Sequence, residues 1–191
     1  MANFNVANVK NQNLRRSKNV ELVCLNKKDL AKVYAKVILT NFLLHNQNAE
    51  KSRLIYTDVN NIVEHNYNVK PATLSKEKAM DENCLSVGTV FYCIQDICYS
   101  NNLPLITCLV VKSGKGISGD GFFSAMLSKD DGQNIYVNFL QENGISYVIG
   151  DEITDDMKAK LWNYECKRCE DCREWQRLLD ILNDVQPYIN N

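Results

Sequence analysis

The residues in this chain best suited to chemistry are cysteines, and they occur in two settings. Cys108 lies in the apolar segment LPLITCLVV, and Cys166, Cys169 and Cys172 are spaced three residues apart in CKRCEDC. A cysteine acts as a nucleophile only as the thiolate, so Cys108 would need a neighbouring group that lowers its pKa. Cysteines three residues apart resemble the start of a zinc or iron–sulfur ligand set. The sequence therefore offers one candidate catalytic residue and one candidate metal site.

The three C-terminal cysteines also fit the buried face of a helix. Their spacing continues through Trp162 and Trp175, and charged residues fill the positions between them. This pattern is typical of an amphipathic helix that packs on a core, and no fourth ligand lies nearby. We therefore expect no metal and no other cofactor. The metal site remains an alternative, with a more distant fourth ligand among Cys24, Cys84, Cys93, Cys98 and Cys108.

A glycine-rich stretch, KSGKGISGDGFF, follows the apolar segment and holds four of the eight glycines. Its G-x-G-x-x-G match lacks the amphipathic helix and the distant acidic residue of a dinucleotide site. We expect instead an exposed loop, in which Gly119 and Gly121 permit close approaches that a Cβ would hinder. Backbone amides and nearby side chains of such a loop are suited to phosphate contacts. The side chains are those of Lys112, Ser113, Lys115 and Ser118.

Charge divides the chain into a basic front and an acidic body. Residues 1–53 contain 10 Lys/Arg and 3 Asp/Glu, whereas residues 54–191 contain 12 Lys/Arg and 20 Asp/Glu. Residues 1–18 are polar and include Arg15 and Arg16, so we expect a flexible basic arm that contacts nucleic acid. No apolar run reaches the roughly 20 residues of a membrane helix, and the start of the chain does not resemble a signal peptide. We expect a cytoplasmic protein with reduced thiols and no membrane partner.

The periodicity of apolar residues predicts an α+β fold with one globular domain over residues 19–191. We expect a helix capped by Asn26, a helix from about Thr57, a helix from about Asn83 to residues 101–102, and a helix over about 131–144. Short strands are expected at 20–25, 105–111 and 146–150. Thr154 is expected to cap one long helix that forms a C-terminal helical part at about 153–186.

Three segments, LIYTDV, LSVGTVFY and NNLPLITCLVV, occur in this order along the chain and resemble segments of O6-alkylguanine-DNA alkyltransferases. LIYTDV is similar to their V-S-Y-G-E-L segment with Tyr56 at the tyrosine, and LSVGTVFY is similar to R-A-V-G-x-A with Val87 and Gly88 matching. NNLPLITCLVV resembles N-P-x-P-I-x-I-P-C-H-R-V-V and places Cys108 at the acceptor cysteine. The same order also resembles a group of uncharacterised bacterial proteins in which alanine replaces this cysteine. The resemblance covers about residues 54–123.

The chain departs from the alkyltransferases at the residues that perform their chemistry. Leu109 stands in place of the histidine that activates the cysteine, and Leu85 replaces the arginine that fills the space of the extruded base. Val110 replaces the arginine after the histidine. The resemblance therefore implies the DNA-binding fold of the family without its alkyl-transfer activity. Catalysis by Cys108 remains only as an alternative.

The resemblance implies a winged-helix-like core over about residues 54–123, with two helices followed by a β-hairpin wing. A winged helix places its second helix in the major groove, where polar side chains read base edges. We therefore expect a non-enzymatic protein that binds DNA or RNA. The expected contacts outside the glycine stretch and the arm are Tyr56, Lys76, Lys78, Asn83, Ser86 and Thr89.

A function of another class remains open. The acidic body disfavours phosphate binding. The same surface would then serve a protein-binding inhibitor or adaptor of a mobile-element or phage-defence system. The sequence indicates no oligomeric state.

Overall fold

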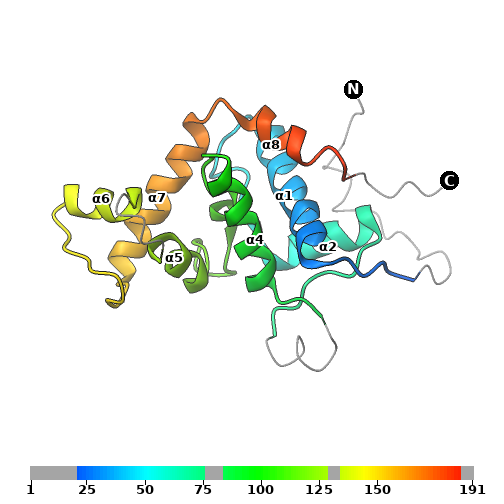
Figure 1. Ribbon diagram of the computed structural model, residues 1–191, viewed down its shortest axis with the longest axis horizontal. Helices are drawn as coiled ribbons and strands as arrows, with labels where there is room; N and C mark the ends of the chain where they lie inside the picture. The colour runs from blue at the N-terminus through cyan, green and yellow to red at the C-terminus, as the bar shows by residue number, and fades with distance from the viewer. Residues whose placement is uncertain (1–20, 76–83, 129–133, 186–191) are drawn as a thin grey trace.

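The computed structural model describes residues 21–75, 84–128 and 134–185, which form a mostly helical structure (Figure 1). The described part of the chain contains seven α-helices, one 3-10 helix and a two-stranded parallel sheet. In chain order these elements are α1 (Lys27–Leu44), β1 (Leu54–Ile55), α2 (Tyr56–Tyr67), α4 (Val87–Ser100), the 3-10 helix η2 (Ile106–Leu109), β2 (Val110–Val111), α5 (Asp120–Leu127), α6 (Ile135–Glu142), α7 (Asp155–Asp171) and α8 (Trp175–Ile181).

Helix α1 is the central element, and α2, α4 and η2 all pack against it. Its start is fixed by Asn26, whose side-chain oxygen accepts hydrogen bonds from the backbone amides of Lys28 and Asp29, as predicted. Apolar side chains are buried on most of the α1 surface, which is typical of a core helix. Figure 1 shows α4 between α1 and the group formed by α5, α6 and α7.

A hydrogen-bonded triangle ties α2 and the chain after it to α1. The hydroxyl of Tyr34 lies 2.6 Å from the side-chain oxygen of Asn60 and accepts a hydrogen bond from the amide of Ala72. The Asn60 amide donates to the Ala72 carbonyl at 2.9 Å. Because Tyr34 is fully buried, its hydroxyl needs these partners.

The small sheet determines where the glycine-rich stretch lies. Strands β1 and β2 are parallel, with Leu54 opposite Val110 and Ile55 opposite Val111. Helix α2 follows β1 directly, so its first residue, Tyr56, lies at the same end of the sheet as the residues that follow β2.

The predicted hairpin wing is wrong. Residues 106–111 form η2 and a two-residue strand, and the chain beyond the glycines forms α5 instead of a returning strand. The physical reason is that β2 finds its partner in β1, while Phe122, Phe123, Met126 and Leu127 bury one face of α5 at helical spacing.

A short loop, residues 112–117, takes the place of the wing, and we call it the glycine loop. The amide of Lys112 donates to the carbonyl of Ile117 at 2.9 Å, which closes the loop. Gly114 and Gly116 have φ angles of +79° and +69°, which other residues rarely adopt. The glycines therefore permit a tight turn, as the sequence predicted, although the turn does not join two paired strands.

The predicted long C-terminal helix is two helices. Thr154 caps α7 as expected, but α7 ends at Asp171 and α8 begins at Trp175. The break turns Trp175 into the core, where its ring meets that of Phe42 edge-on at 5.9 Å and its indole donates to the Cys169 carbonyl. Burial of a large aromatic side chain favours this bend over a continuous helix.

Other predicted boundaries also shift. Helix α2 begins one residue before Thr57 without a side-chain cap, and α4 begins at Val87 with Ser86 as its cap. Within residues 21–25 the predicted strand is reduced to one bridge between Val23 and Val69. Residues 146–150 form no strand. No helix in the described ranges combines the length and the apolar character needed to cross a membrane.

Candidate nucleic-acid interface

Tyr56 joins the glycine-rich stretch to α4. Its ring lies 5.3 Å from the ring of Phe91 on α4, and its hydroxyl interacts with the backbone of Gly119. Burial raises the pKa of Tyr56, and the Gly119 hydrogen bond and the nearby Lys112 ammonium lower it by less. Tyr56 therefore holds two surface elements together, and its half-buried ring is not an open contact surface.

The outer face of α4 begins with the two hydroxyl residues that the sequence singled out. Ser86 accepts the hydrogen bond of the Thr89 amide, and the two hydroxyl oxygens lie 2.9 Å apart. Ser86 is thus the helix cap, whereas Thr89 is exposed. Tyr92 lies three residues further along the helix, and 54% of it is exposed.

The glycine loop presents a short polar tip. Ser113 and Lys115 are exposed. Ser118 is buried, and its hydroxyl donates to the carbonyls of Cys108 and Val110 at 3.2 and 3.0 Å. Ser118 therefore stabilises the fold beneath the loop and cannot contact a phosphate, which corrects its predicted role.

Lys112 belongs to a chain of ion pairs. Its ammonium lies 2.7 Å from Oδ2 of Asp120, and Lys158 lies 2.9 Å from Oδ1 of the same carboxylate. Lys158 also lies 3.6 Å from Asp155. These contacts join the glycine loop, α5 and α7 on one surface. The two ammonium groups hold the pKa of the Asp120 carboxyl well below its usual range.

The two glycines that begin α5 differ in their surroundings. A Cβ at Gly119 would lie 3.1 Å from the Tyr56 hydroxyl oxygen and 3.3 Å from Cε of Lys112. A Cβ at Gly121 would meet no atom within 4 Å. The predicted close approach is therefore correct for Gly119 and wrong for Gly121.

Several predicted contacts lie outside the described residues. They are the arm at 1–18 with Arg15 and Arg16, and Lys76, Lys78 and Asn83 before α4. Within the described ranges, the candidate contact residues are Thr89 and Tyr92 on α4, Ser113 and Lys115 on the glycine loop, and the Lys112–Asp120–Lys158 bridge.

Cys108 lies in η2 beneath this surface and is fully buried. Its sulfur is 3.6 Å from that of Cys169, and its carbonyl accepts a hydrogen bond from the Trp162 indole at 2.9 Å. Burial raises the pKa of the Cys108 thiol well above its ordinary value. A neutral, buried thiol is a poor nucleophile, so this environment does not favour alkyl transfer.

The C-terminal cysteines do not converge on a common point. Cys166 and Cys169 are buried on the inner face of α7, whereas Cys172 lies at the helix end and accepts a hydrogen bond from the Glu174 amide. Among the described residues, no three His, Cys, Asp or Glu side chains are arranged to hold a metal ion. The buried pair fits the predicted core stripe.

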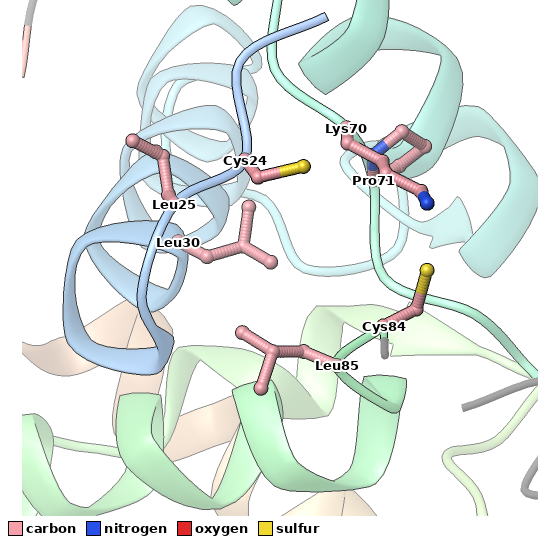
Figure 2. A pocket seen from close by; sticks show the side chains of 7 residues that line it. All are labelled: Cys24, Leu25, Leu30, Lys70, Pro71, Cys84 and Leu85. Carbon is pink, nitrogen blue, oxygen red and sulfur yellow. The ribbon is translucent and has the colours of Figure 1, made fainter. Parts of the chain in front are cut away.

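A small pocket lies on another part of the surface, between α1 and the chain that leads into α4 (Figure 2). Its volume of about 40 Å³ is far below the roughly 300 Å³ of a typical small-molecule site. The lining is mainly apolar, with one thiol from each side. Its residues are Cys24, Leu25, Leu30, Lys70, Pro71, Cys84 and Leu85. The pocket holds a few water molecules at most.

Sequence reasoning missed three residues of the candidate interface. Tyr92 was detectable in principle, because it falls off the apolar face defined by Val90, Ile94 and Cys98. Asp120 and Lys158 are 38 positions apart in the chain, and a local sequence pattern cannot predict an ion pair over that separation.

Comparison of the chain with protein-family models, curated proteins and solved structures found no match.

Proposed function

We propose that this protein binds nucleic acid without catalysing a reaction. Its contact surface is formed by the exposed face of α4 and by the glycine loop. In this proposal α2 and α4 are the first and second helices of a winged-helix-like reader. The glycine loop takes the position of the wing. The resemblance of residues 54–123 to alkyltransferase DNA-binding domains supports this reading.

The observation that carries the proposal is the junction made by Tyr56. Its ring contacts Phe91 of α4, and its hydroxyl meets Gly119 at the start of α5. A duplex reader needs a helix and a loop in a fixed relation, because a groove contact and a phosphate contact must be made together.

The exposed groups suit the two kinds of contact. Thr89 offers a hydroxyl to a base edge or phosphate, and Tyr92 offers an aromatic face with a polar end. Lys115 at the loop tip supplies a positive charge that needs no particular sequence. The acidic body opposes binding, so we expect modest affinity that falls steeply with salt.

The test is fluorescence anisotropy of the full chain with labelled duplex and single-stranded probes of mixed sequence at two salt concentrations. We expect micromolar binding at low salt, a preference for duplex, and a marked loss at the higher concentration. Absence of binding to both probes at low salt would contradict the proposal. A strict preference for the single strand would contradict the groove-reading helix.

A second function, protein binding, is favoured by a different surface. Ile135 on α6 and Val148 and Ile149 in the following loop are exposed aliphatic residues. Exposed apolar side chains on an acidic body are more suited to a protein partner than to phosphate. Pull-down from the native host with wild type and with Val148→Asp would test this function. A partner lost in the variant would favour it.

A further inference from the structure

Asp120 binds two lysines in a way that resembles the binding of a phosphate. Lys112 contacts one carboxylate oxygen at 2.7 Å, and Lys158 contacts the other at 2.9 Å. The lysines come from the glycine loop and from α7, so the fold brings together two ammonium groups that are distant in sequence. A backbone phosphate likewise presents two charged oxygens on one atom.

The exposure of the three side chains differs. The Asp120 side chain is 65% exposed, whereas those of Lys112 and Lys158 are 38% and 19% exposed. The Asp120 carboxylate is therefore more accessible to solvent than the side chains of the two lysines. An anion that approaches from solvent meets the same two ammonium groups.

We propose that Lys112 and Lys158 form a binding site for a backbone phosphate, and that Asp120 occupies this site in the free protein. The inference rests on the proposed function for the source of the phosphate. It assigns Asp120 the role of a competitor that lowers affinity, and it adds Lys158 to the contact surface.

A phosphate can replace Asp120 at Lys112 and Lys158 if the loss of the two ion pairs is offset. Exposed ion pairs contribute little to stability, because water solvates the separated charges nearly as well. Release of Asp120 gives up the two contacts that lower its pKa, so a bound phosphate must replace both of them. Asp155 lies 3.6 Å from Lys158 and partly offsets its positive charge.

The first experiment uses inorganic phosphate as the probe and follows the backbone amide signals of residues 119 and 121 by NMR. Asp120→Asn removes the competing charge and should bind phosphate more tightly than wild type. Asp156→Asn is the matched control, because it removes the same charge from a carboxylate that pairs with Lys160 on its own helix, at 2.7 Å. Equal phosphate affinity in the two variants would overturn the inference.

The second experiment measures duplex affinity of the same variants. Removal of one nearby charge predicts a gain of about fivefold for Asp120→Asn and a smaller gain for Asp156→Asn. Addition of Lys158→Ala to Asp120→Asn should remove most of this gain, and a gain that survives would count against the site. If phosphate binds as expected and duplex does not, the site stands and the proposed function fails.

Discussion

At the scale of single residues, burial determines which thiols react. Cys108 and Cys169 are fully buried, and burial raises the pKa of Cys169 to about 11. Cys24 is exposed. Since iodoacetamide reacts with thiolates, a short pulse on the folded protein should modify Cys24 and spare both buried cysteines.

Peptide mapping by mass spectrometry would measure this pattern, with urea-unfolded protein as the control in which all cysteines react. Rapid modification of Cys108 in the folded protein would contradict its placement in the core. It would also restore Cys108 as a candidate nucleophile.

Gly119 provides a second prediction at this scale. A methyl group there would lie 3.1 Å from the Tyr56 hydroxyl oxygen, so Gly119→Ala should destabilise the protein by about 1 kcal/mol because the neighbouring side chains must shift. Gly121→Ala lies in α5 with open space around it and should stabilise by roughly 0.5–1 kcal/mol. Urea unfolding measures both changes.

The Tyr56→Phe background identifies the cause. Gly119→Ala should cost less there, because the hydroxyl oxygen that it meets is gone. If Gly119→Ala lowers the free energy of unfolding equally in both backgrounds, the Tyr56 hydroxyl is not the group that opposes a side chain at position 119.

At the scale of elements, a buried carboxylate holds the apolar segment before η2 against α7. Glu165 is fully buried, accepts a hydrogen bond from the Leu105 amide, and pairs with Arg168 at 2.7 Å. Arg168 in turn donates to the Tyr136 hydroxyl, which brings in α6. This network connects α6 and α7 to the segment that leads into η2.

Glu165→Gln should destabilise the protein by roughly 3 kcal/mol, because it leaves the Arg168 charge without its partner. Thermal or urea unfolding measures the loss. The control Glu174→Gln removes an exposed partner of Arg177 and should change stability by less than about 0.5 kcal/mol. Similar losses in the two variants would show that the buried pair has no special role.

The elements also show what the sequence could predict. Helix starts at Asn26 and Thr154 were recognisable because an N-cap is a local signal. The parallel pairing of Leu54–Ile55 with Val110–Val111 was not, because the partners are more than 50 residues apart and each strand has only two residues. The break before Trp175 was missed for a similar reason, since it depends on contact with Phe42 in α1.

Some residues of the candidate site could also be predicted from the sequence, and others could not. Lys115 was predicted from the glycine-rich stretch and Thr89 from the winged-helix resemblance, and both side chains are exposed. Ser118 was assigned to the surface because its neighbours are glycines, yet its hydroxyl is used by carbonyls below the loop. The Asp120 bridge depends on tertiary structure alone.

At the scale of the whole molecule, the buried thiols predict sensitivity to alkali. Burial raises the pKa of Cys98 to about 12 and that of Cys169 to about 11, from an ordinary value near 9. Above pH 9 the unfolded chain ionises these thiols while the folded chain does not. Their contribution to stability is therefore complete below pH 9 and is lost as the pH rises toward 11–12.

Urea midpoints at pH 7, 8.5 and 10 would measure this effect. At pH 10 we expect a loss of roughly 1 kcal/mol for each buried thiol. Between pH 7 and pH 10 the free energy of unfolding should fall less in Cys98→Ala than in wild type. Unchanged stability between pH 8.5 and pH 10 would contradict the buried, neutral state of these thiols.

We propose that the glycine loop and α4 form one surface that contacts phosphate. The most direct measurement is duplex affinity across a salt series for wild type, Lys115→Ala and the control Lys167→Ala, an exposed lysine nine residues beyond Lys158 on α7. We predict that Lys115→Ala weakens binding about equally for all sequences and reduces the salt slope by about 1, whereas Lys167→Ala matches wild type. Equal behaviour of the two variants, or no duplex binding by wild type at low salt, would contradict the claim.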